Sequence, residues 1–207
     1  GDNPLMVSAI KGNSAICKVL LEHDAKVNIE NNNGFTPLMN AAQNGHLEKM
    51  KLLLDKGCDV NHKRKQTGQT ALHSAAYNNH PEACSLLVSR GAEINGQTNI
   101  GETVLMMNLQ GGHADVFNEG AGSSRKQCLV SFFADISKML LEYGEIINTE
   151  NIMGFTALIN AAQIGNLKDM KLLLDKGCDV NCKRKQTEQT ALHSAVQAAS
   201  DLAEACA

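Results

Sequence analysis

The apolar positions between Asn33 and Ala75 follow the spacing of two short amphipathic helices. In each helix they recur three and four residues apart, which places them on one face. The first set is Leu38, Ala41 and Ala42, and the second is Leu47, Met50, Leu53 and Leu54. Because alanines are small, a neighbouring helix can approach the first helix closely. The pattern therefore predicts a pair of short helices that pack against further helices.

Capping and turn residues indicate where these helices begin and end. Thr36 precedes Pro37, the order of an N-cap followed by a residue preset for the first helical turn. Gly45 and Gly57 are placed to end the two helices in a left-handed conformation. The polar, turn-rich segment Asp59–Gly68 then leads to the next capping threonine. We expect this segment to project from the helices as an exposed, hairpin-like finger.

The same unit occurs several times along the chain. Asn33–Ala75 recurs as Met153–Ala195 with 34 of 43 positions identical. A shorter period is marked by capping threonines spaced by 34, 33, 53 and 34 residues, namely Thr36, Thr70, Thr103, Thr156 and Thr190. Such a period is typical of a solenoid, in which each unit buries its apolar face against its neighbours.

The repeated segments resemble the ankyrin repeat. They share a TPLM- or TALH-like tetrapeptide, an Ala-Ala pair, a Leu-Leu pair and a GCDVN-like ending. The resemblance covers nearly the whole chain and implies an all-α ankyrin-repeat solenoid of about six stacked helix-turn-helix repeats with protruding fingers. We expect one domain, residues 1–207, with repeats at 2–32, 33–66, 67–99, 100–151, 152–186 and 187–207, the last incomplete.

Repeat four carries an insertion of roughly 20 residues near residues 114–131. The repeat begins and ends with the usual pattern, so we expect its second helix to be split or extended. The Gly- and Ser-rich part is typical of an exposed loop, whereas the apolar stretch that follows can pack back on the repeats. Two interpretations are open: a tolerated surface insertion, or a loop that contacts a partner through Phe132 or Phe133.

Composition narrows the function classes. The 19 Lys and Arg against 22 Asp and Glu give a net charge of −3, which provides no field to attract phosphate backbones or anionic membranes. Aromatic residues make up only 3%, too few for stacking platforms. Seven cysteines without a CxxC pair are typical of free thiols in a reducing compartment, and no apolar run is long enough for a membrane span. We expect an intracellular, cytoplasmic monomer that binds neither nucleic acid nor membrane.

Catalytic and metal-binding patterns are weak. His80, Glu82 and Cys84 superficially match the HxE element of zinc deaminases, but the downstream PCxxC element is missing. Cys178 and Cys182 supply two ligands where structural zinc takes four. We therefore expect no catalytic residue, no cofactor and no metal.

Histidines of the TALH tetrapeptides have two candidate roles. The ankyrin resemblance implies that His73 and His193 hydrogen-bond within and between repeats. A general base is the alternative, but the sequence places no Ser, Cys or carboxylate beside either one. We favour the structural role.

The resemblance also implies a binding surface. In ankyrin-like solenoids, partners generally dock on the concave side made by the fingers and first helices. The positions are those just before the Gly of Gly-x-Thr, the x residue, and the two residues after Ala-Ala. Here they include Asn33, Phe35, Gln43, Asn44, Gln69, Tyr77, Asn78, Ile100, Glu102, Gln110, Met153, Phe155, Gln163 and Ile164.

Five of these side chains are apolar or aromatic although their positions are expected to face solvent: Phe35, Tyr77, Met153, Phe155 and Ile164. Exposed side chains of this kind indicate contact with a partner. Partial burial against a neighbouring finger is the alternative.

Two KRK runs lie at the predicted finger tips: Lys63, Arg64 and Lys65, and Lys183, Arg184 and Lys185. Such a run is most simply a solvated tip, but it also suits an acidic protein segment or, less well, nucleic acid. Nucleic-acid binding would weaken steeply with added salt.

Asn61 and Asn181 lie in the fingers, eight residues after a leucine and close after an aspartate. In animal proteins, the ankyrin resemblance implies that such asparagines are substrates for hydroxylation by an intracellular oxygenase.

The sequence therefore predicts a non-catalytic protein-protein interaction module, an adaptor or scaffold. The alternative is a regulatory ankyrin domain of a larger enzyme, channel or signalling protein that acts in cis. Because the chain begins at Gly1 and stops within a repeat, we expect it to be part of a longer protein. The partner's identity is not encoded in the core residues of such repeats.

Overall fold

The computed structural model describes residues 2–11, 13–118, 135–184 and 186–197. Within these residues, helices are the only regular secondary structure, and turns join them. The all-α class predicted from the sequence is confirmed. The chain forms two compact units, Gly1–Asn99 and Ile100–Ala207. Their boundary coincides with the predicted start of repeat four.

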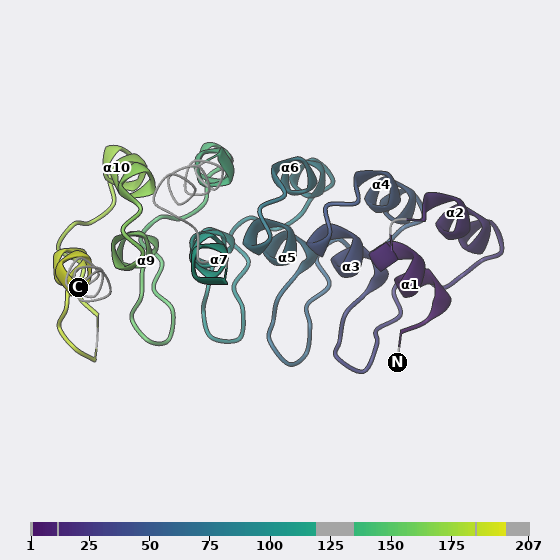
Figure 1. Ribbon diagram of the computed structural model, residues 1–207, viewed down its shortest axis with the longest axis horizontal. Helices are drawn as coiled ribbons and strands as arrows, with labels where there is room; N and C mark the ends of the chain where they lie inside the picture. The colour runs from purple at the N-terminus through teal and green to yellow at the C-terminus, as the bar shows by residue number, and fades with distance from the viewer. Residues whose placement is uncertain (1, 12, 119–134, 185, 198–207) are drawn as a thin grey trace. The chain divides into compact units, whose positions relative to one another are not determined.

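The first unit consists of three helix pairs: α1 (Pro4–Lys11) with α2 (Ser14–Glu22), α3 (Pro37–Gln43) with α4 (Leu47–Asp55), and α5 (Ala71–Tyr77) with α6 (Pro81–Ser89). The first helices of the pairs pack side by side in one row, and the second helices form another row (Figure 1). The fingers project from the first-helix row on the side away from the second helices (Figure 1).

Leucines and alanines build the core in successive layers. Leu38 and Leu72 are buried in the first-helix row, and Leu53 and Leu87 in the second. Leu53 lies on α4 and Leu87 on α6, and these two helices of neighbouring pairs pack on each other. The apolar faces predicted from helical spacing are therefore the faces that pack between repeats.

The predicted helix caps are confirmed. Thr36 accepts a hydrogen bond of 3.3 Å from the backbone N–H of Met39, two residues after Pro37. Gly45 and Gly57 adopt φ angles of 64° and 80°, a conformation that costs glycine little. In a helix of seven residues, most backbone N–H and C=O groups lie near an end and have no partner within the helix. The caps supply partners for some of these groups.

His73 has the structural role predicted for it within its repeat. It is fully buried, and its Nδ1 lies 2.9 Å from the hydroxyl of Thr70 and accepts from the Thr70 backbone N–H at 3.3 Å. His193 and Thr190 repeat the hydroxyl contact at the same 2.9 Å. The imidazole thus helps to cap the first helix.

The second unit contains α7 (Val104–Asn118), a helix over residues 135–142, α9 (Ala157–Gln163), α10 (Leu167–Asp175) and a helix over residues 191–197. Here α7 packs on α9, which in turn packs on α10 (Figure 1).

The first helix of repeat four is extended, which the sequence pattern does not predict, and the predicted split or extension of the second helix falls on residues outside those described. α7 continues through Gly111 and Gly112 to Asn118 and has 15 residues, against seven in α9. Glycine inside a helix costs about 1 kcal/mol relative to alanine but does not prevent it, and no proline follows. The rest of the predicted insertion, with Phe132 and Phe133, lies outside the described residues.

Candidate partner-binding surface

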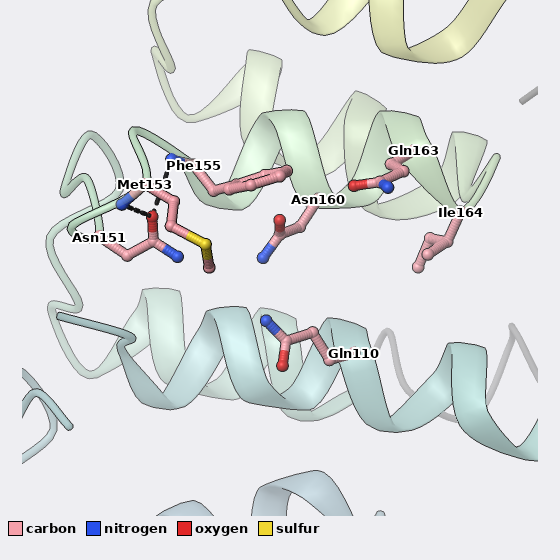
Figure 2. Close-up of a pocket in the computed structure, with 7 residues that line it drawn as sticks. All are labelled: Gln110, Asn151, Met153, Phe155, Asn160, Gln163 and Ile164. Carbon is pink, nitrogen blue, oxygen red and sulfur yellow. Dashed lines mark hydrogen bonds between the residues drawn. The ribbon is translucent and has the colours of Figure 1, made fainter. Parts of the chain in front are cut away.

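A glycine and an asparagine side chain shape the finger turn that precedes α9. Asn151 Oδ1 accepts backbone hydrogen bonds from Met153 at 3.0 Å and Phe155 at 2.9 Å (Figure 2). Gly154 lies between them with a φ of 75°. Asn31 makes the equivalent bonds in the finger turn that precedes α3, at 3.0 and 2.9 Å. The turn therefore fixes the backbone that carries the predicted contact residues.

An arginine of each KRK run lies against a phenylalanine of the preceding finger. The Arg64 guanidinium is 3.9 Å from the centroid of the Phe35 ring, and that of Arg184 is 3.8 Å from Phe155. Arg64 also donates to the carbonyl of Asn33 through Nε at 3.2 Å and Nη2 at 2.9 Å. Partial burial against a neighbouring finger thus accounts for part of the surface of both half-buried rings.

The lysines of these runs have different surroundings from the arginines. Lys63, Lys65 and Lys183 are exposed, and Lys183 Nζ lies 3.1 Å from a carboxylate oxygen of Glu188. Lys185 lies outside the described residues. Lysines therefore present positive charge to solvent at the finger tips. The two arginines instead contact the preceding finger.

The side chain of the finger asparagine Asn61 bonds to the following repeat. The Asn61 side chain accepts from the N–H of Glu93 at 2.8 Å and donates to the carbonyl of Gly91 at 3.0 Å. Asn181 is exposed. Hydroxylation of Asn61 and Asn181 stays a prediction, and peptide mapping of the native protein by mass spectrometry tests it.

Most of the predicted contact residues are at least partly accessible. The exposed ones are Asn33, Gln43, Asn44, Ile100, Met153 and Gln163, and the half-buried ones are Phe35, Gln69, Tyr77, Asn78, Phe155 and Ile164. Glu102 is different, because only 9% of it is exposed and its carboxylate accepts a 2.7 Å hydrogen bond from the side chain of Gln110. Glu102 is thus little available to a partner.

The residues after the Ala-Ala pair differ between the copies. In repeats two and three, Asn44 donates to the carbonyl of Asn40 and Asn78 to that of Ser74, both at 2.8 Å. Repeat five has Ile164 at this position. It therefore presents an apolar side chain where the other two present an amide.

A groove of about 240 Å³ lies in the second unit, between α7 on one side and α9 with its preceding finger on the other (Figure 2). It is lined by Gln110, Asn151, Met153, Phe155, Asn160, Gln163 and Ile164. Four of these are neutral amides and three are apolar, so the lining carries no formal charge. Such a lining favours a neutral ligand, because a charged group would lose hydration without gaining a counter-ion.

The sequence pattern identifies five of the seven lining residues and misses Asn151 and Asn160. Asn151 belongs to the finger turn and is 3% exposed. Asn160 is 7% exposed, and its Nδ2 has no hydrogen-bond partner. In the sequence, Asn160 could have been noticed as an asparagine in the middle of a short helix that is otherwise mostly apolar.

Thiols with a raised pKa are poor nucleophiles at neutral pH, and the described residues include several of them. Burial raises the pKa of Cys58 and of Cys84 to about 12, and that of Cys178 to about 11. His80, four residues from Cys84, has its Nε2 3.0 Å from the carbonyl of Gln43. The Cys84 thiol is therefore protonated at neutral pH. The His80 imidazole connects repeat three to repeat two. No cluster of three or more His, Cys, Asp or Glu that could hold a metal occurs among the described residues.

Comparison with family models identifies these repeats. A model of ankyrin repeats in three copies matches residues 1–64 and 129–205, and one for many copies matches residues 45–88. The chain belongs to the ankyrin-repeat family. Ankyrin repeats generally serve as protein-interaction modules. None of the described helices of this ankyrin-repeat chain is both long and apolar enough to cross a membrane.

Curated relatives share ankyrin-repeat segments of different lengths with this chain. Alpha-latrocrustotoxin-Lt1a of Latrodectus tredecimguttatus is 47% identical over 64 residues, 30% of this chain and 4% of the toxin. Probable E3 ubiquitin-protein ligase XBOS33 of Oryza sativa subsp. japonica is 31% identical over 185 residues, 87% of this chain and 32% of that protein. The human NAD-capped RNA hydrolase NUDT12 is 43% identical over 63 residues, 29% of this chain and 14% of the hydrolase. This chain therefore spans at most about a third of the length of these relatives.

Proposed function

We propose that this ankyrin-repeat chain is a non-catalytic adaptor or scaffold that binds a protein partner on the surface made by its fingers and first helices. The observation that carries the proposal is the groove of repeat five, which is lined by five residues predicted to contact a partner. Its apolar side chains include Met153, which is 40% exposed. Exposed apolar groups beside neutral amides are typical of interface centres.

The internal duplication supports repeat five as the contact region. The two copies differ at nine of 43 positions, and two of these differences, Asn33 to Met153 and Asn44 to Ile164, lie at predicted contact positions. Both replace an amide with an apolar side chain, whereas the buried leucines stay the same. The copies thus share a scaffold and differ in the surface they offer.

We also propose where the protein acts, what class of partner it binds and its oligomeric state. The free thiols of the described residues, among them Cys17, Cys58 and Cys84, suit a reducing compartment, so we place the protein inside the cell and in the cytoplasm. The weakly acidic composition favours protein over nucleic acid as the partner. We propose that the chain acts as a monomer.

A regulatory domain that acts in cis is the second candidate. It is favoured by the relatives, since one named as an E3 ubiquitin-protein ligase and one named as an RNA hydrolase each contain much more chain than the matched segment. The full reading frame tests this candidate. A catalytic or channel segment in that frame, together with crosslinks from it to the groove, would favour regulation in cis over an adaptor.

The adaptor proposal is tested by crosslinking capture and mass spectrometry with the chain as bait. The variant Met153→Asn with Ile164→Asn carries the residues of repeat two, so it is expected to fold and to lose the partner. Lys171→Ala, an exposed change on α10, is the matched control and should keep it. Equal capture by the wild type and both variants would contradict the proposed surface.

A further inference from the structure

We propose that the groove of repeat five binds an extended peptide segment in a defined way. An uncharged apolar side chain of the peptide packs among Met153, Phe155 and Ile164, and a main-chain carbonyl oxygen accepts a hydrogen bond from Asn160 Nδ2. This inference rests on the proposed function and adds the chemistry of the bound segment and the residue that recognises it.

Asn160 is the first support for this inference. It is 93% buried, since 7% of it is exposed, yet its Nδ2 has no acceptor. A buried donor without a partner costs about 1–3 kcal/mol. The helix does not need this side chain, because the backbone N–H of Asn160 already bonds to the carbonyl of Thr156 at 3.0 Å. The unpaired donor therefore suits an acceptor that arrives with a ligand.

The same position in other repeats shows that packing does not require an asparagine. Val7 occupies it in repeat one, Ser74 in repeat three and Met107 in repeat four. Met107 is 5% exposed, so a fully apolar side chain fits this place in the fold. What distinguishes Asn160 from these residues is its primary amide, which lines a groove.

The rest of the lining specifies the ligand. Figure 2 shows Asn160 between Met153 and Phe155 at one end of the groove and Gln163 and Ile164 at the other, all on the side facing α7. With apolar groups flanking the unpartnered donor of Asn160 and no charged residue in the lining, the matching ligand is neutral and carries an acceptor beside an apolar side chain. An extended peptide has this combination at every apolar residue.

Repeat two supplies a matched comparison within the chain. Asn40 is equivalent to Asn160, is 6% exposed and also has an Nδ2 without a partner. However, two of the three apolar neighbours, Met153 and Ile164, are replaced there by Asn33 and Asn44. Asn40 thus keeps the donor and an equivalent of Phe155, Phe35, but lacks two of the three apolar side chains, so we expect it to bind an apolar segment much more weakly.

The test is a titration of the ¹⁵N-labelled chain with N-acetyl-leucine N-methylamide, followed by NMR. This probe carries an apolar side chain between two amide carbonyls. We expect it to shift the side-chain amide resonances of Asn160 and not those of Asn40. N-acetyl-glutamate N-methylamide and N-acetyl-lysine N-methylamide are expected to shift neither. Equal shifts at both asparagines, or equal shifts with the charged probes, would overturn the inference.

Two variants separate recognition from folding. Asn160→Met installs the residue of repeat four and should weaken probe binding about tenfold or more, with an unchanged or higher Tm. Asn40→Met makes the same change in repeat two and should leave probe binding unaltered. Asn160→Ser, which installs the residue of repeat three, replaces Asn160→Met if that variant does not fold, and the same weakening is expected. Unaltered binding by a folded Asn160 variant would overturn the inference.

Failure of this inference can be told apart from failure of the proposed function. If the captured partner is lost with Met153→Asn and Ile164→Asn but kept with Asn160→Met, the groove binds a protein without using Asn160. If no variant changes capture, the proposed surface itself is wrong.

Discussion

Phe35 and Phe155 lie at positions that the sequence pattern expects to face solvent, and each has an arginine over its ring. The contact is possible because the next finger brings its KRK run back over the preceding one. An arginine stacked on a ring contributes about 0.5–1 kcal/mol at an exposed site and more when desolvated. At the residue scale, these half-buried rings therefore stabilise neighbouring fingers.

The first prediction concerns Arg64. Arg64→Ala removes the contact with Phe35 and the hydrogen bonds to Asn33, so the free energy of unfolding should fall by about 2 kcal/mol. Lys63→Ala, next to it and exposed, should change it by less than about 0.5 kcal/mol. Urea denaturation measures both. Similar losses would mean that the charge of the finger tip, and not the stacking, matters.

A second prediction follows from Glu145. Its Oε1 accepts a hydrogen bond of 2.9 Å from the N–H of Leu105, it is 6% exposed, and burial raises its pKa to about 7. Because this pKa lies above the value of 4.5 of an unperturbed glutamate, the folded state binds the proton more tightly. Stability should therefore fall as pH rises from about 5 to about 8, by up to about 3 kcal/mol.

The variant Glu145→Gln tests this pH dependence. Glutamine keeps an acceptor for Leu105 and cannot ionise, so this component of the pH dependence should disappear. The measurement is urea denaturation of wild type and variant at both pH values. A wild type that is equally stable at both, or a variant with the same slope as the wild type, would show that Glu145 is not the titrating group.

At the scale of elements, the duplicated helix pairs share a framework and differ in a buried polar cluster. In the second unit, Ser137 donates to Asn108 at 3.0 Å, and Asn166 holds the buried Asp169 through its side-chain amide. Repeat two has Lys49 at the position of Asp169. Lys49 and Asp169 are both buried and carry opposite charges. The residues around each of them therefore differ between the two copies in a way that suits its charge.

The third prediction exchanges these residues. Asp169→Lys removes the acceptor for Asn166 and buries an unmatched positive charge, so it should lower the free energy of unfolding by about 3 kcal/mol or more. Lys168→Glu also installs the repeat-two residue, but at an exposed position, and should cost less than about 1 kcal/mol. Equal effects of the two exchanges would argue against the cluster.

At the scale of the whole molecule, a weakly acidic chain presents basic tips and a neutral groove. A partner held mainly in the groove should be retained when salt is raised, because few charges are involved. The fourth prediction is that capture of the partner changes little between about 50 and 200 mM salt, and that Lys63→Glu with Lys183→Glu has little effect. A steep loss with salt, as phosphate contacts would produce, would favour the basic tips over the groove.

Much of the groove lining could be predicted because it follows the repeat register. Met153, Phe155, Gln163 and Ile164 were placed by their offsets from Gly154 and the Ala-Ala pair, and all four line the groove. Asn160 could not be found in this way. Its importance comes from the absence of an acceptor for Nδ2, which depends on what surrounds α9 and not on its position in the repeat.

The sequence alone determined the all-α class, the helix caps and the layered core, because apolar periodicity, threonine caps and left-handed glycines act over a few residues and repeat along the chain. Tertiary structure decided the rest. It placed Arg64 over Phe35, brought Glu145 to the start of α7 and left Asn160 without an acceptor beside a groove. Each of these depends on residues that packing brings together from different elements, and local spacing carries no information on such distances or burial.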